Sequence, residues 1–202
     1  MNTSQKNDVK ISRRTTFSPR VKNARIQLIC GPMFSGKTTA LISQVQQLRN
    51  EGKDVFVFKP QLDNRYADKS VVSHDKNKVE AFAIDKSVQI LDYHLNADVV
   101  AVDEVQFFDD KIVEVLQKVA NDGKDVIAAG LDMDYLGRPF GAIPALLTVA
   151  DDVKKLNSVC TFCSGKARFS HRISQDNGTV VLGEKDKYVP LCRSCYNELK
   201  DQ

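Results

Sequence analysis

The segment 26–38, IQLICGPMFSGKT, joins a short apolar run to a complete Gly-x-x-x-x-Gly-Lys-Thr sequence. Phosphate-binding loops have this form because glycines let consecutive backbone N–H groups wrap a phosphate, and the helix that follows adds partial positive charge. In such a loop Lys37 reaches the β- and γ-phosphates of a nucleotide, and Thr38 offers a hydroxyl to Mg²⁺. The residues expected to bind phosphate are Gly31, Pro32, Met33, Phe34, Ser35, Gly36, Lys37 and Thr38.

The regions around this loop predict alternating strands and helices. Near-continuous apolar runs are typical of strands buried on both faces of a parallel sheet, and one-sided apolar spacing is typical of helices packed on it. The predicted strands are 26–30, 55–58, 80–84, 99–102 and 126–129, and the predicted helices are 37–51, 86–96 and 111–120. This alternation predicts an α/β fold with a mostly parallel sheet, and it favours a true phosphate loop over a chance match.

Two acidic residues follow the apolar run 99–102. An acidic residue at the end of a buried strand lies at the carboxyl edge of the sheet, beside the phosphate loop. We therefore expect Asp103 to hold Mg²⁺, directly or through water, and Glu104 to act as a general base on a hydroxyl or water. The alternative is that the pair only caps the next turn. These motifs indicate a phosphate-loop kinase or nucleotidase without distinguishing the two.

Four of the five cysteines form two Cys-x-x-Cys pairs that are 28 residues apart. Two such pairs can present four thiolates at the corners of a tetrahedron, which predicts a closed structural Zn²⁺ site. A redox pair is the alternative, but it would be expected at the start of a helix in the main domain. The predicted zinc ligands are Cys160, Cys163, Cys192 and Cys195, whereas Cys30 is expected to be a buried apolar residue.

Charge and composition limit the class of protein. Residues 1–25 carry a net charge of +6, whereas the whole chain carries +3, so the remaining residues carry −3. This mildly acidic remainder gives no support to a nucleic-acid-binding surface. We expect 1–24 to be a disordered basic leader, with a transit peptide as the alternative. No segment resembles a signal peptide or a membrane span, so a cytoplasmic protein is expected. A change of composition near Asp151 predicts a nucleotide-binding domain over 25–151 and a zinc-binding domain over 152–202.

Several longer strings resemble the type II thymidine kinases, the cellular cytosolic and bacterial family. The resemblance covers about residues 25–196, and its strings are GPMFSGKT at 31–38, DNRY at 63–66, SHD at 73–75, VDEVQFF at 102–108, GLDMDYLGRPFG at 130–141, and DKY with CRSCY within 186–196. It implies a RecA-like P-loop domain and a small zinc-stapled domain whose lasso loop covers thymidine. The implied reaction is transfer of the γ-phosphate of ATP, with Mg²⁺, to the 5′-hydroxyl of thymidine and of deoxyuridine.

The resemblance also implies roles for particular residues. Glu104 would take the proton from the 5′-hydroxyl, and Arg65 would contact phosphates. The residues implied to contact the nucleoside are Phe107, Leu131, Tyr135 and Phe140 around the base, Met33 beneath it, and Ser170, Val181, Gly183 and Tyr188 on the lasso. Ser170 and Tyr135 depart from the threonine and phenylalanine of the vertebrate enzymes, which affects the polarity of the pocket. The family is also typically homotetrameric and inhibited by thymidine triphosphate.

Two other classes of protein share parts of this pattern. A phosphate-loop ATPase or GTPase with a zinc module would hydrolyse nucleotide without a nucleoside acceptor, but the base-reading motif of GTPases is incomplete at Asn77–Glu80. A zinc-ribbon protein that binds nucleic acid would need a basic surface, which the acidic body disfavours. The histidines His74, His94 and His171 are expected to be structural or exposed, and Phe108 is expected to pack in the core.

Overall fold

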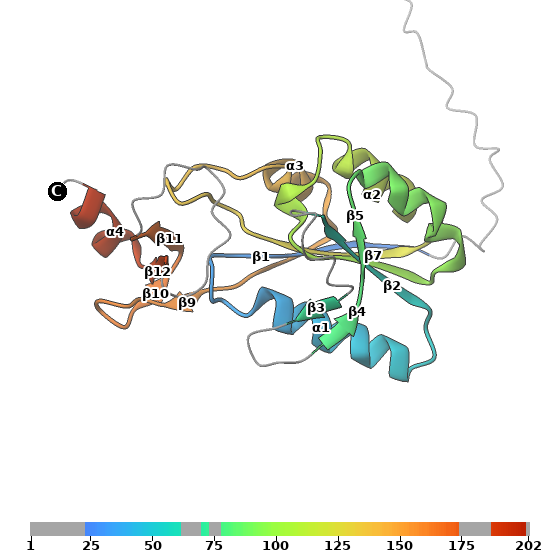
Figure 1. Cartoon of the computed structure of the whole chain (residues 1–202), viewed down its shortest axis with the longest axis horizontal. Coiled ribbons are helices and arrows are strands. Elements are labelled where there is room, and N and C mark those ends of the chain that lie inside the picture. The colour runs from blue at the N-terminus through green and yellow to red at the C-terminus, as the bar shows by residue number, and fades with distance from the viewer. Residues whose placement is uncertain (1–22, 62–69, 73–77, 174–186, 201–202) are drawn as a thin grey trace, which may run out of the picture.

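The computed structural model describes residues 23–61, 70–72, 78–173 and 187–200. Its centre is a parallel six-stranded sheet (Figure 1). In spatial order the strands are β5 (Phe82–Ile84), β2 (Val55–Pro60), β6 (Val99–Val102), β7 (Asp125–Gly130), β1 (Ile26–Cys30) and β8 (Asp152–Lys155). Every pairing in this sheet is parallel, as the apolar runs predicted.

Both faces of the sheet are covered, which is why its strands read as continuous apolar runs. One face carries α1 (Lys37–Asn50) and the hairpin of β3 (Ser70–Val72) with β4 (Lys78–Glu80). The opposite face carries α2 (Ile112–Asn121) and α3 (Ile143–Val149). Neighbouring residues of β1 divide between the two cores, since Leu28 packs with α2 and α3 while Ile29 packs with α1.

The predicted elements are largely confirmed, with corrections near β5. The expected strand 80–84 is two strands, because the chain turns at Ala81 from the β3–β4 hairpin into β5. The expected helix 86–96 is a pair of 3₁₀ helices, η1 (Ser87–Asp92) and η2 (His94–Asn96), which are separated at Tyr93. There the Leu91 carbonyl accepts a hydrogen bond from the His94 ring (3.0 Å). Helix α3 was not predicted.

A smaller cysteine region, residues 158–173 and 187–200, lies beyond the carboxyl end of β1 (Figure 1). It contains two antiparallel pairs, β9 (Ser158–Val159) with β10 (Lys166–Ala167) and β11 (Phe169–Arg172) with β12 (Tyr188–Leu191), followed by α4 (Arg193–Lys200). Its own small core includes Cys160, Phe169, Leu191 and Tyr196. The predicted boundary near Asp151 falls just before β8, which still pairs with β1 of the main sheet.

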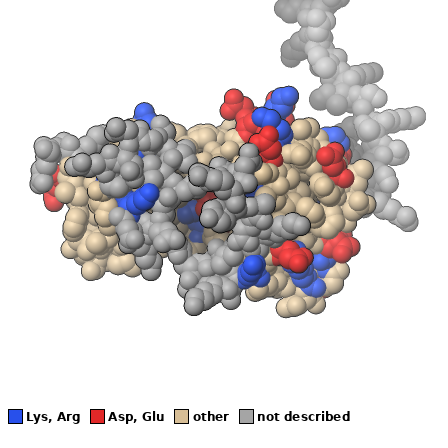
Figure 2. All heavy atoms as spheres, in the orientation of Figure 1, with Lys and Arg blue, Asp and Glu red and all other residues tan. Residues whose placement is uncertain are grey.

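Charges of both signs lie on the face of the molecule drawn in Figure 2. On the face drawn in Figure 2, Lys and Arg side chains lie beside Asp and Glu side chains rather than in a broad patch of one sign. Within the described ranges, no helix is long and apolar enough to cross a membrane.

Candidate active site

The phosphate loop connects the end of β1 to the start of α1 and requires glycine at both of its ends. Gly31 has φ +148°, and a Cβ there would lie 2.5 Å from the backbone oxygen of Leu156. Gly36 has φ +81° and forms the N-cap of α1. Between them, the Ser35 hydroxyl donates to the Pro32 carbonyl (2.8 Å), which tightens the turn. The predicted strand–loop–helix arrangement is therefore present.

Lys37 is buried within this loop, and its Nζ donates to the Pro32 carbonyl (2.8 Å). Burial lowers the pKa of Lys37, while the nearby carboxylates of Glu104, Asp103 and Asp132 act in the opposite direction. The ammonium group thus lies among acidic groups at the edge of the sheet where β1, β6 and β7 end. A polyanionic phosphate would give it a direct partner.

Thr38 and Asp103 meet across this edge, as the motifs predicted. The Thr38 hydroxyl donates to Asp103 Oδ2 (3.1 Å), and Asp103 is buried at the end of β6. Burial, together with repulsion from Glu104, raises the pKa of Asp103 from 3.8 to about 7. A hydroxyl and a carboxylate are oxygen ligands that suit Mg²⁺, and a cation would offset the penalty of the buried charge.

Glu104 directly follows Asp103 in an unusual backbone conformation. Its φ of +51° lies in the left-handed region, which is strained for a residue with a side chain. The Glu104 N–H donates to Asp103 Oδ1 (3.0 Å), and its Oε2 accepts from Gln106 Nε2 (2.6 Å). This conformation holds a half-buried carboxylate next to the phosphate loop, close enough to Lys37 for an electrostatic interaction.

The residues expected around a nucleoside base form several direct contacts. Phe107 and Phe140 pack edge to face, with ring centroids 5.4 Å apart. The Met33 N–H donates to the hydroxyl of the buried Ser170 (2.9 Å), which connects the phosphate loop to β11. The Leu131 N–H donates to Gln106 Oε1 (3.0 Å), beside Glu104.

Tyr135 and Tyr188 are connected by an arginine that sequence reasoning did not identify. The guanidinium carbon of Arg172 lies 3.8 Å from the Tyr135 ring centroid and 5.5 Å from that of Tyr188. Arg172 also donates to the Tyr188 hydroxyl (3.1 Å). Arg172 is 37 positions from Tyr135 in the sequence, so no local pattern pointed to this contact.

Two further polar residues at the site were also missed. Asp132 is buried two residues beyond β7 and forms an ion pair with Lys155 (2.8 Å) at the end of β8. The rule that selected Asp103, an acidic residue just after a buried strand, would have selected Asp132 as well. No comparable sequence pattern identifies Gln106. Three predicted residues, Arg65, Val181 and Gly183, lie outside the described residues.

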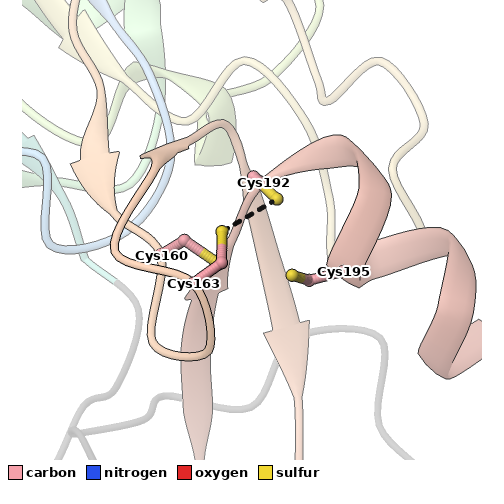
Figure 3. A group of neighbouring side chains, drawn as sticks. All are labelled: Cys160, Cys163, Cys192 and Cys195. Atoms are coloured by element: carbon pink, nitrogen blue, oxygen red, sulfur yellow. Dashed lines mark hydrogen bonds between the residues drawn. The ribbon is translucent and has the colours of Figure 1, made fainter.

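The four paired cysteines converge, as Figure 3 shows. Cys160 and Cys163 come from the turn after β9, and Cys192 and Cys195 from the end of β12 and the first turn of α4. Their Sγ atoms all lie within 4.8 Å of one another, with 3.6 Å between Cys163 and Cys192. Thiolates around a tetrahedral Zn²⁺ at 2.3 Å are about 3.8 Å apart, so this cluster can hold a metal ion.

Comparison with known proteins identifies the family of this chain. A family model described as thymidine kinase matches residues 24–196. A thymidine kinase from Bacteroides thetaiotaomicron is 46% identical over 175 residues, covering 87% of this chain and 88% of the relative. Thymidine kinases from Rhodothermus (47% over 171 residues; 85% and 80%) and Porphyromonas gingivalis (44% over 178 residues; 88% and 87%) are similarly close. The resemblance seen in the motifs is thus confirmed, and the chain belongs to the thymidine kinase family.

Proposed function

We propose that this protein transfers the γ-phosphate of ATP to the 5′-hydroxyl of thymidine, and also of deoxyuridine, to give the 5′-monophosphate. The observation that carries the proposal is the meeting of Lys37, the Thr38–Asp103 pair and Glu104 at one edge of the sheet, in a chain of this family. A phosphate loop alone would equally serve an ATPase. A half-buried carboxylate beside it supplies the base that an alcohol acceptor requires.

In the proposed step, Glu104 accepts the 5′-hydroxyl proton as the oxygen attacks the γ-phosphorus. The bond between that phosphorus and the bridging oxygen breaks, and ADP leaves. Lys37 and the backbone N–H groups of residues 31–38 hold the phosphates and offset the developing charge. Thr38 and Asp103 would hold Mg²⁺, which would neutralise part of the phosphate charge.

The nucleoside would lie against the aromatic contacts described above. A thymine ring is flat and methylated, so stacking and edge contacts from Phe107, Tyr135 and Phe140 suit it, with Leu131 and Met33 completing the apolar wall. Ser170 and Tyr188 would contact the nucleoside from the cysteine region. The roles of Arg65, Val181 and Gly183 rest on the family resemblance. A lid from this region would exclude water and limit ATP hydrolysis.

We propose that the four cysteines bind a structural Zn²⁺. Four thiolates complete a tetrahedral shell and leave no position for a reacting water, so the metal would stabilise the fold and take no part in the transfer. The division into two domains near residue 151, a homotetramer, inhibition by thymidine triphosphate and a cytoplasmic location are further predictions from the sequence and the family resemblance.

The test is to incubate the purified protein with ATP, Mg²⁺ and thymidine and to measure thymidine 5′-monophosphate and ADP by chromatography. Equimolar products are expected. ATP hydrolysis that proceeds equally without thymidine would instead identify an ATPase. Glu104→Gln should lower kcat by about 10² to 10⁴ and leave nucleotide affinity within about threefold. The control is the same substitution at the exposed Glu114 on α2, which should have no effect.

A further inference from the structure

Gln106 is a buried amide whose two ends are both engaged. It lies in η3 (Val105–Phe107) and is only 3% exposed. Its Nε2 donates to Glu104 Oε2 at 2.6 Å, and its Oε1 accepts from the Leu131 N–H at 3.0 Å. The side chain therefore bridges the turn after β6 and the turn after β7.

The chemistry of the two partners fixes the direction of this amide. A backbone N–H can only donate, so the group facing Leu131 must be the amide oxygen. The NH₂ group must then face Glu104, where it needs an acceptor. Glu104 Oε2 is therefore held as an acceptor, and the remaining oxygen, Oε1, is the one left for another partner.

Two glycines surround Gln106 closely enough to exclude any side chain. A Cβ on Gly130 would lie 2.5 Å from Gln106 Oε1. A Cβ on Gly141, whose φ is +51°, would lie 2.2 Å from the Gln106 backbone oxygen. Both the amide head and the backbone of Gln106 are thus confined by neighbouring main chain, so the hydrogen bond to Glu104 has little freedom to shift.

We propose that Gln106 is a positioning residue for phosphoryl transfer, which fixes the Glu104 carboxylate by occupying Oε2 and leaves Oε1 to accept the proton. The inference rests on the proposed role of Glu104 as base. An unrestrained glutamate side chain samples several rotamers, whereas proton transfer needs the acceptor within hydrogen-bond reach of the reacting hydroxyl. Through Leu131, the same amide also ties the base to the proposed wall of the thymine pocket.

Gln106→Glu is the sharpest single change, because it keeps the shape and the acceptor for Leu131 but replaces the donor with a carboxylate oxygen. Two carboxylates would then face each other, and the Glu104 carboxylate should turn away. Since a misplacement of about 1 Å can lower a rate about 10²-fold, we expect kcat to fall by about that factor while KM for ATP stays within about threefold. The control Gln46→Glu, on the exposed side of α1, should match the unmodified protein.

The exchanged pair E104Q/Q106E separates positioning from folding. It restores a hydrogen bond between the two side chains with donor and acceptor reversed, so the melting temperature lost in Q106E should return. Turnover should not return, because the carboxylate is now at the wrong position. Within the E104Q background, Q106E should lower kcat by less than twofold.

Three outcomes would overturn the inference. The first is a near-normal kcat in Q106E. The second is that Q106E lowers kcat by the same factor in the wild-type protein and in E104Q. The third is recovery of turnover in the exchanged pair. If E104Q itself retains full turnover, the role of Glu104 as base fails and this inference fails with it. If E104Q loses most of its turnover but Q106E lowers the remaining kcat by the same factor as in the wild type, only the positioning role fails. Should Q106E fold poorly, Gln106→Met removes the donor without adding a charge and supports the same cycle.

Discussion

Replacing Asp103 with asparagine should stabilise the Mg²⁺-free protein at neutral and alkaline pH while abolishing turnover. Asp103 lies buried at the end of β6, next to Glu104. Asparagine has nearly the same shape and can keep both local contacts. Its oxygen can accept from the Glu104 N–H, and its NH₂ can donate to the Thr38 hydroxyl, which reverses the bond that Thr38 makes to Asp103.

The size of the effect follows from the pKa of Asp103. Burial and the charge of Glu104 raise that pKa from 3.8 to about 7. At 1.36 kcal/mol per pH unit, the ionised form is destabilised by about 4 kcal/mol in the folded state. Allowing about 1 kcal/mol for the weaker hydrogen bonds of an amide, the variant should gain about 3 kcal/mol. For a chain of this length that corresponds to a rise in Tm of about 6–12 °C.

The pH dependence has a definite sign. Because the folded pKa is raised, the folded protein binds more protons than the unfolded chain between pH 3.8 and about 7. As the pH rises through that window, the unmodified protein should therefore lose stability relative to the variant. Above the window, the difference in stability between the two proteins should stay constant. Below pH 3.8 Asp103 is protonated in both states and its charge penalty is gone, so the variant should then be less stable by the roughly 1 kcal/mol allowed for its weaker hydrogen bonds.

The measurement is thermal and urea unfolding of both proteins in buffer without Mg²⁺ at pH 8 and pH 3.5, followed by kinase assays with Mg²⁺. Added Mg²⁺ with nucleotide should raise the Tm of the unmodified protein more than that of the variant. Equal or lower stability of Asp103→Asn at pH 8 without Mg²⁺ would refute the reasoning, because the buried charge would then carry no penalty. A fully active variant would refute the proposed Mg²⁺ role.

Two further substitutions test the backbone and the cysteine cluster. Gly141→Ala should destabilise the protein by more than about 2 kcal/mol, since it combines a left-handed φ with a Cβ 2.2 Å from Gln106 O. The control is Gly52→Ala, where φ is +79° but no atom lies within 4 Å of the added Cβ, so this variant measures the cost of the backbone conformation alone. If urea unfolding shows that both variants lose the same free energy of unfolding, the steric argument is contradicted. Cys160→Ser should lower both the bound zinc, measured by mass spectrometry, and the Tm. The control Cys30→Ala should keep the metal, and full zinc content in Cys160→Ser would exclude the predicted site.

The main sheet could be predicted because its strands are buried on both faces and its helices are amphipathic. Residues 26–30 and 99–102 were predicted to the residue, since apolar runs there end at a glycine and at an acidic pair. Helix α3 was not predicted because Ile143–Val149 is short, has a proline at its second position and contains only one polar residue, Thr148, so no polar face marks a helix in the sequence. The break at Tyr93 between the two 3₁₀ helices was not predicted, because it accompanies a tertiary contact in which His94 bonds Asp122 (2.7 Å) at the end of α2.

The residues of the candidate site also fall into two groups, those that the sequence could identify and those that it could not. Lys37, Thr38, Asp103 and the cysteines could be identified because their chemistry depends on short spacings within a motif. Gln106 and Arg172 could not, because each is held in place by contacts that include residues far away in the sequence: Gln106 also contacts the nearby Glu104, but its bond to Leu131 spans 25 positions. Side chains that orient a reacting group are selected by the folded arrangement, so a single sequence carries little sign of them.

The cysteine region contacts the phosphate loop directly, which gives the proposed metal a second consequence. Besides the bond from Met33 N–H to Ser170, the Ser158 hydroxyl donates to the Phe34 carbonyl (3.1 Å). Just before this region, the backbone oxygen of Leu156 lies close to Gly31. These contacts attach the middle of the loop to β9 and β11, whose ends lie next to the cysteine cluster. If the metal were only an anchor for a lid, its loss would leave the loop unchanged. Because the cysteine region instead holds two of the loop's backbone groups, its loosening should also weaken the preorganisation of the phosphate site.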